Sequence, residues 1–245
     1  MVTGEGVDGA ERPDAVVVGA GAAGLSLACH LAAAGWPGRV VVIDDGAVPV
    51  DHAAWAYWSR GDQLLDPWAT AGVDRLLVRS PGRDLDLTLH AYRYRRMTGR
   101  RLAEATDHLL AAAPGITRVR GTVEQIDEGP DGARVTVLLA GTGERTVLTP
   151  RWVFDSVGLA GDRPTPPAAR LEFHGEHVEW DDDRVDPSAV TLMDFRTSQS
   201  DGLAFVYVLP MSRRSALVER TRFVVGSGAP TSGTADADHL ARYLG

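Results

Sequence analysis

Three glycines and one aspartate near the start of the chain have the spacing of a dinucleotide-binding site. The segment V-V-V-G-A-G-A-A-G places Gly19, Gly21 and Gly24 in the pattern G-x-G-x-x-G, and Asp44 ends the apolar run V-V-V-I-D. The first glycine permits a tight turn, the second lets the backbone approach a pyrophosphate, and the third lets a helix pack on a strand. Asp44 is placed to accept hydrogen bonds from a ribose. The predicted nucleotide-binding residues are Gly19, Ala20, Gly21, Ala22, Ala23, Gly24 and Asp44.

A carboxyl group in the second half of the chain has the surroundings of a proton donor. If residues 216–223 form a strand, side chains alternate between its two faces, so Glu219 points away from Arg220 and Arg222. Burial without a cationic partner raises the pKa of a carboxyl group and keeps it protonated near neutral pH, as a general acid requires. The alternative is a structural hydrogen bond or a salt bridge at a strand end. The residues expected on this face are Leu217, Glu219, Thr221 and Phe223.

Asp194 is the second candidate for a general acid. In an extended segment its side chain shares one face with Val190 and Leu192, and also with Arg196. An ion pair with Arg196 would hold the carboxylate charged, so it competes directly with a catalytic role.

The elements that would position the glycines can be placed from the sequence. We expect a buried strand from Ala15 to Val18, a helix from about Ala22 to Ala34, and a second strand from Arg39 to Ile43. Gly35 is suited to end the helix. Strand, glycines, helix, strand and terminal acid in this order favour a nucleotide site over an ordinary strand-helix-strand unit with a glycine-rich turn.

A further group of strands follows the first unit. Strands near residues 118–126, 133–139 and 146–148, separated by glycine-rich turns, predict a β-meander. The meander leads into R-W-V-F-D-S-V-G, a strand that delivers Asp155 and Gly158 toward the nucleotide. This order resembles the FAD-binding domain of the glutathione reductase type, which implies FAD as the cofactor and Asp155 as a further cofactor-binding residue. A plain antiparallel hairpin in any α/β enzyme is the alternative.

The fold class that these elements predict is α/β, with a glutathione-reductase-type FAD-binding Rossmann domain that contains the β-meander, and a β-rich substrate domain. We expect a loop or short helix around W-A-Y-W at residues 55–58. Residues 226–245 are expected to be flexible or incomplete, because Gly, Ser, Thr and Ala dominate up to Asp238 without a core-building period. The expected boundaries are 14–50 and 91–160 for the FAD-binding domain, and 51–90 and 161–225 for the substrate domain.

Composition excludes several classes of protein. The formal net charge of -8 disfavours a nucleic-acid partner. The chain contains no Lys, and a P-loop NTPase needs Gly-Lys-Ser/Thr. No apolar run is long enough for a membrane-spanning helix and no signal peptide is visible, so we expect a cytoplasmic protein. His174 and His177 would point to opposite faces of an extended segment, so no metal site is predicted.

A cluster of arginines in the middle of the chain has two interpretations. One is a site for phosphate or anionic lipid, which would place the protein peripherally on the inner face of the cell membrane. The other, which we favour, is a solvated face. The residues are Arg93, Arg95, Arg96, Arg100 and Arg101.

Five local patterns, in their order behind the nucleotide fingerprint, resemble the bacterial and plant lycopene cyclase family, and the resemblance extends from Asp14 to Phe223. They are W-A-Y-W, A-Y-R-Y-R-R-M-T-G, L-M-D-F-R, F-V-Y-V-L-P and A-L-V-E-R-T. The family carries its proposed catalytic acid in a Leu-x-Glu-x-Thr context, which Glu219 matches here.

The resemblance implies carotenoid biosynthesis. The expected reaction is a redox-neutral closure of β-ionone rings at the ends of lycopene or a related polyene, with FAD in its reduced form and NADPH as the reductant. Such chemistry needs a proton donor, a dry apolar tunnel and electron-rich faces around a carbocation. The alternatives are a flavin-dependent reductase or monooxygenase acting on another isoprenoid, and a truncated, non-catalytic nucleotide-binding remnant.

The chain also departs from the family pattern. Ala53 and Ala54 stand where the family usually has an arginine before the aromatic pair, and Val157 stands where it has an arginine after the acid-serine step. Family members continue past the position of Gly245 with a glycine-rich segment that returns to the flavin. We therefore expect a fragment, a truncated product, or one half of a split enzyme whose C-terminal complement is supplied in trans.

Overall fold

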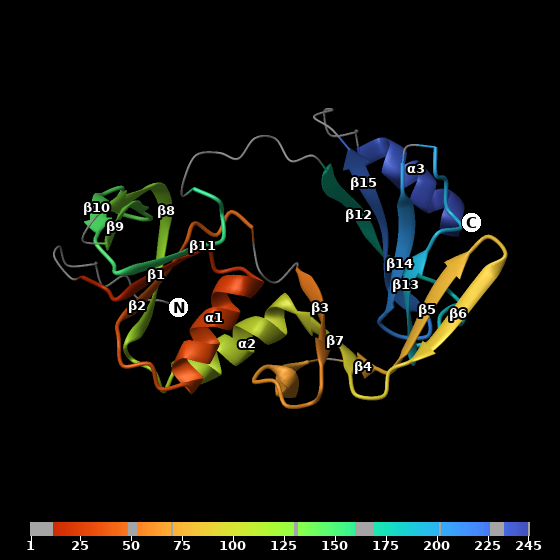
Figure 1. Ribbon diagram of the computed structural model, residues 1–245, viewed down its shortest axis with the longest axis horizontal. Helices are drawn as coiled ribbons and strands as arrows, with labels where there is room; N and C mark the ends of the chain where they lie inside the picture. Colours follow the sequence, from red (N-terminus) through yellow and green to blue (C-terminus); the bar gives the residue numbers. More distant parts are fainter. Residues whose placement is uncertain are drawn as a thin grey trace. The chain divides into compact units, whose positions relative to one another are not determined.

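A computed structural model describes residues 12–48, 53–69, 71–129, 132–159, 169–200, 202–225 and 233–244. The chain divides into two compact units (Figure 1). The first unit contains Met1–Ala71 and Arg95–Asp162, and the second contains Gly72–Tyr94 and Arg163–Gly245. No helix in the described ranges is long and apolar enough to cross a membrane.

A six-stranded sheet with the order β10-β9-β8-β2-β1-β11 forms the centre of the first unit. Its middle is parallel, because β1 pairs in parallel with both β2 and β11, and β2 pairs in parallel with β8. Beyond that pairing, β8 continues into an antiparallel meander with β9 and β10. The strands are β1 (Ala15–Val18), β2 (Val40–Asp44), β8 (Ile116–Gly129), β9 (Gly132–Leu139), β10 (Arg145–Leu148) and β11 (Trp152–Asp155).

The two faces of the parallel strands have different cover. Helix α1 (Ala22–Ala33) and helix α2 (Gly99–Leu110) lie side by side (Figure 1), and both contribute to the apolar cluster that includes Val17 and Val42. Val16 and Ile43, on the other face, pack against side chains of the meander. Burial on both faces explains why these strands are continuous apolar runs. The expected strand, helix, strand and meander are all present, with ends that differ by a few residues.

The aromatic segment W-A-Y-W does not form the expected loop or short helix. It is part of strand β3 (Ala54–Ser59), in a three-stranded sheet with β7 (Arg93–Thr98) and β4 (Ala71–Val73). The short 3-10 helix η2 (Asp66–Trp68) follows it. Alternate side chains Trp55 and Tyr57 pack against a core of Leu25, Met97 and Leu102. That packing explains why residues 53–69 lie with the first unit, whereas we expected residues 51–90 to belong to the substrate domain.

The second unit contains a six-stranded sheet with the order β12-β15-β14-β13-β5-β6. All neighbouring pairs are antiparallel except β13 and β5, which are parallel. The strands are β5 (Arg75–Ser80), β6 (Arg83–Thr88), β12 (Ala169–Glu179), β13 (Ala189–Asp194), β14 (Ala204–Pro210) and β15 (Ser215–Val225).

Helix α3 (Gly233–Leu244) covers one face of this sheet (Figure 1). Leu240 is fully buried against Val206 and Val218, and Tyr243 packs beside it. The expectation that residues 226–245 lack a core-building pattern is therefore wrong for residues 233–244; residues 226–232 lie outside the described ranges. We call this side of the sheet the α3 face. The opposite side, which carries Leu76, Val190, Leu209, Tyr207 and Leu217, is called the Glu219 face.

Candidate functional site

The glycine turn lies at the carboxyl end of β1, and two of its glycines are required by contacts within the protein. Gly19 has φ +97°, and its N–H donates to the carbonyl of Ile43 at 2.7 Å. A β-carbon on Gly19 would overlap the Ser156 hydroxyl, and one on Gly24 would overlap the Gly19 carbonyl. A β-carbon on Gly21 would meet nothing within 4 Å. The space over Gly21 is therefore available to a ligand that lies on the backbone.

Asp44 lies beside this turn because it ends the neighbouring parallel strand β2. Its Oδ2 accepts from the Ala20 N–H at 2.8 Å, and its Oδ1 accepts from the Gly46 N–H at 2.7 Å. Each carboxylate oxygen retains a lone pair for a ligand hydroxyl. Arg120 pairs with Asp44 across the strands, and its guanidinium lies against Gly46. Sequence reasoning did not find Arg120, because only the pairing of β2 with β8 brings it to this edge.

Asp155 ends β11 at the same edge of the sheet, in register with Val18. Its carboxylate accepts three backbone N–H groups from the loop that follows, at 2.9, 2.9 and 2.5 Å, from Val157, Gly158 and Leu159. The neighbouring Ser156 hydroxyl donates to the Val18 carbonyl at 2.6 Å. In this structure Asp155 thus shapes a loop next to the glycine turn, and Ser156, which the sequence analysis missed, attaches that loop to β1.

The start of helix α1 completes this edge. Ala22 and Ala23 form its first turn, its N-cap Gly21 makes no side-chain capping bond, and the first turn contains no acidic residue. Backbone N–H groups at a helix N-terminus bind anions, and the helix dipole favours negative charge there. The structure brings together all the predicted nucleotide-binding residues from β1, α1, β2 and β11, and the arrangement fits a dinucleotide pyrophosphate.

A cavity of about 280 Å³ lies on another side of α1. Asp66 supports its wall: the Tyr57 and Ser59 hydroxyls donate to its carboxylate at 3.1 and 2.5 Å, and Arg95 lies 3.3 Å from it. Burial and the Asp66 charge raise the pKa of Tyr57 to about 12. The residues around the cavity are Ala22, Ser26, His30, Trp55, Tyr57, Trp58, Gln63, Leu65, Met97 and Leu102.

Glu219 lies in the middle strand of three in the second unit, and its register partners are Gly175 on β12 and Tyr207 on β14. The Thr221 hydroxyl donates to its Oε1 at 3.2 Å. Burial raises the pKa of Glu219, and the hydrogen bond from Thr221 opposes that shift without cancelling it. This side chain is therefore the more readily protonated of the two candidate acids.

Aromatic and apolar side chains occupy the positions around Glu219. The next row of register partners places Phe173 and Phe205 on either side of Thr221, and Phe205 meets Phe195 edge to face at 5.7 Å between ring centroids. The Tyr207 hydroxyl donates to that of Tyr94 at 3.3 Å. Burial raises the pKa of Tyr94, and the negative charge of Glu219 contributes to the same shift. The Glu219 face thus combines one protonatable acid with electron-rich rings.

Asp194 has different surroundings. Its side chain is 1% exposed, and the Arg196 guanidinium donates to both carboxylate oxygens at 2.9 and 2.8 Å. The Tyr243 hydroxyl of α3 donates to Oδ2 at 2.9 Å. Burial acts to raise the pKa of Asp194, but the hydrogen bonds from Arg196 and Tyr243 outweigh it and hold the pKa below its usual value. The ion pair that we considered as an alternative to catalysis is present.

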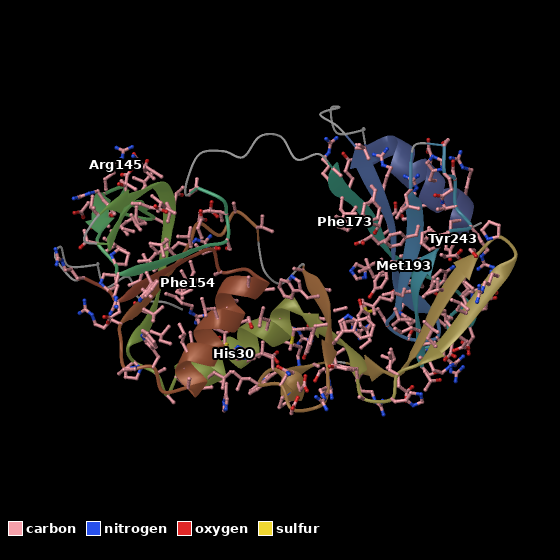
Figure 2. The ribbon with its side chains drawn as sticks, viewed as in Figure 1. His30, Arg145, Phe154, Phe173, Met193 and Tyr243 are labelled. Carbon is pink, nitrogen blue, oxygen red and sulfur yellow. The ribbon has the colours of Figure 1, made fainter. Side chains whose placement is uncertain are left out.

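The two acids lie on opposite faces of one sheet, which corrects the face we expected for Asp194. Asp194 pairs with Val206, and Thr191 pairs with Val208, so both lie on the α3 face although three positions separate them. A β-bulge between them adds one residue and reverses the alternation. Val190 therefore stays on the Glu219 face while Asp194 does not. Figure 2 shows Phe173 on the side of the sheet away from Tyr243.

Two remaining patterns can be placed. His174 and His177 both lie on strand β12, and within the described ranges no group of three or more metal-binding side chains is present. Members of the arginine cluster pair with acids of their own surroundings: Arg93 with Asp74 at 3.7 Å, Arg95 with Asp66, and Arg101 with Glu104 at 2.7 Å. These pairs use part of the positive charge that a phosphate or lipid site would need.

Comparison with known proteins identifies the family. A family model described as "Lycopene cyclase protein" matches residues 14–244. The lycopene beta-cyclase of a Paracoccus species is 30% identical over 234 residues, which is 95% of this chain and 57% of that protein. The chain thus spans less than two thirds of this relative.

Solved structures share the fold at low sequence identity. A flavoprotein/dehydrogenase from Cytophaga hutchinsonii superposes with a TM-score of 0.66 at 15% identity, over 96% of this chain and 60% of that one. The p-nitrophenol 4-monooxygenase of Pseudomonas putida gives a TM-score of 0.59 at 20% identity, over 95% and 61%. Both likenesses concern the fold, which is mixed α/β. The family match over nearly the whole sequence shows that this chain belongs to the lycopene cyclase family.

Proposed function

We propose that the chain provides the nucleotide site and the general acid for redox-neutral cyclisation of lycopene ends to β-ionone rings, a step of carotenoid biosynthesis. The observation that supports this most directly is the placement of Glu219. It is a half-buried carboxyl group with a raised pKa, on a sheet face shared with Phe173, Phe205 and Tyr207. A proton donor among aromatic rings is what protonation of a polyene requires.

The cofactor in this proposal is FAD, held by the edge of the first unit in the manner of a glutathione-reductase-type domain. Gly19 to Gly24 and the start of α1 would hold the pyrophosphate, Asp44 would bind the ribose, and the Asp155 loop would bound the site. Reduced FAD supplies an electron-rich ring system when bound, and NADPH is the proposed reductant. An anion site and a ribose acceptor at one sheet edge support this assignment.

The residues of the second unit account for the proton chemistry. The Glu219 carboxyl group gives its proton to a terminal C=C bond, whose π electrons form the new C–H bond and leave a tertiary carbocation. A second C=C bond of the same polyene attacks that cation and forms the ring C–C bond. Loss of a proton from a ring carbon then forms the ring double bond. One proton enters and one leaves, so the product has the mass of the substrate, and the aromatic faces stabilise the cation without quenching it.

The test supplies the chain with lycopene and chemically reduced FAD, alone and together with the remaining C-terminal part of the Paracoccus relative, and analyses the products by chromatography and mass spectrometry. We expect cyclic carotene with unchanged mass. A product of altered mass would indicate a reductase or monooxygenase instead. Intact lycopene in both arms, with flavin bound, would contradict a cyclase.

The cofactor assignment has its own test, because the space over Gly21 is open. Gly21→Val places a branched side chain where the pyrophosphate would lie, so we expect loss of flavin binding, while Gly21→Ala gives a smaller loss. Flavin content is measured by absorbance after desalting. Unchanged flavin content in Gly21→Val would contradict the proposed site.

A further inference from the structure

Gly175 lies in the interior of strand β12, directly opposite Glu219. Its φ is not in the left-handed region that favours glycine. A β-carbon built there would lie 3.4 Å from the Glu219 β-carbon and 3.4 Å from Leu217 Cδ1, which is ordinary van der Waals contact. The backbone and the described neighbours therefore leave room for a larger residue at this position.

Glycine in a strand interior has an energetic cost, because it loses more backbone entropy on folding and adds no side chain to the packed surface. A strand glycine that local geometry does not require often marks a place where a ligand approaches the backbone closely. At Gly175 the missing side chain exposes one flank of the Glu219 side chain. The other flank is occupied by Tyr207.

Apolar side chains line the approach to this gap. Phe173 is 60% exposed, and Leu171 and Phe223, which are register partners, are also exposed. All three lie on the Glu219 face, since Phe173 pairs with Thr221 and Leu171 with Phe223 along the same alternation. Exposed apolar side chains gathered on one surface are typical of a site for an apolar partner.

We propose that Gly175 determines substrate access to Glu219: its lack of a side chain opens a passage across β12 through which the end group of a linear, apolar polyene reaches the Glu219 carboxyl group, with Leu171, Phe173 and Phe223 along its entrance. This inference rests on the proposed function and names the residue that sets the size of the accepted end group. A methyl-branched terminal isoprene unit is bulky, so closing the gap with two methyl groups blocks it.

The test compares Gly175→Val with Ala169→Val, which adds the same kind of side chain to the same strand and face about 20 Å away. Lycopene binding in detergent micelles is measured by quenching of protein fluorescence, and turnover with reduced FAD is measured as above. We expect Gly175→Val to weaken binding and to lower kcat/KM by about 10-fold to 100-fold. Ala169→Val stays within about two-fold of the unaltered chain. Gly175→Ala lies between them.

Folding and access are separated by a stability measurement. A β-branched residue suits a strand better than glycine does, so Gly175→Val should unfold at the same or a higher denaturant midpoint while its binding is lost. Gly175→Val that binds and turns over lycopene normally, in a chain that Glu219→Gln inactivates, would overturn this inference and leave the proposed function intact. An unaltered chain that does not bind lycopene would overturn both.

Discussion

The two faces of the second sheet carry one acid each and treat it in opposite ways. On the α3 face, Asp194 is sealed under a helix, bonded twice by Arg196 and once by Tyr243, and held as a charged carboxylate. On the Glu219 face, the acid has a single hydroxyl donor from Thr221 and lies among aromatic rings, which favours its protonated form. The comparison teaches that neighbours, not burial alone, decide whether an acid stabilises a fold or donates a proton.

The largest expected effect is on turnover. Glu219→Gln keeps the shape of the side chain and removes its acidic proton, so cyclisation should slow by roughly 10²-fold to 10⁴-fold, about 3–5 kcal/mol in the barrier. Flavin content should not change. Product formation is measured in the two-arm assay, with Asp194→Asn as the matched control. If Asp194→Asn stops turnover and Glu219→Gln does not, the roles of the two acids are reversed.

The next effect concerns stability. Asp194→Asn removes the charge that Arg196 and Tyr243 share, and we expect the free energy of unfolding to fall by about 1–3 kcal/mol. This value is below that for a fully buried pair because the Arg196 side chain is 50% exposed and solvent screens it. Urea denaturation measures the change. Glu219→Gln serves as the comparison and should leave the free energy of unfolding at neutral pH unchanged or higher.

A smaller effect isolates the contribution of helix α3. Tyr243→Phe removes only the hydroxyl that donates to Asp194, so we expect a loss of about 1 kcal/mol, typical of one hydrogen bond to a buried acceptor. In the double variant with Asp194→Asn the two losses should not add, because they share this bond. Additive losses would show that Tyr243 stabilises the sheet through packing alone.

The smallest effect is the pH dependence of stability, where the two acids differ in sign. The lowered pKa of Asp194 gives stability that is present above the unfolded value of 3.8 and is lost as pH falls through the folded value. The raised pKa of Glu219 gives stability that is present below the unfolded value of 4.5 and is lost as pH rises through the folded value. Each amide variant should flatten the stability curve in its own window. Equal slopes in both variants would contradict the assignment.

The first unit could be predicted from local sequence to a large extent. The glycine turn, its flanking strand and helix, and the acid at the end of β2 follow from spacing and apolar runs, and β1, α1 and β2 lie where they were expected within one or two residues. These features are local, because a turn needs particular glycines and a buried parallel strand needs a continuous apolar run. Arg120 was missed because its place beside Asp44 depends on strand pairing.

The second unit shows where a pattern of alternation fails. Strand β15 is regular, so alternation placed Glu219 on the face opposite Val218 correctly. Strand β13 contains a bulge, which no apolar pattern announces, and Asp194 changed faces. Helix α3 was missed because its apolar residues are few and are buried only by the sheet. The strand that contains W-A-Y-W was missed because its partner β7 lies far along the chain.

The parallel pairing of β5 with β13 has a consequence for synthesis. The β5–β6 hairpin ends at Thr88, and β13 begins at Ala189, roughly 100 residues later. At translation rates of about 5–20 residues per second, the hairpin waits roughly 5–20 s on the ribosome with one edge unpaired. Two strands alone are only marginally stable in water, and an unpaired edge invites association with other chains. The nascent chain therefore passes through a period in which chaperone protection of residues 75–88 decides between folding and aggregation.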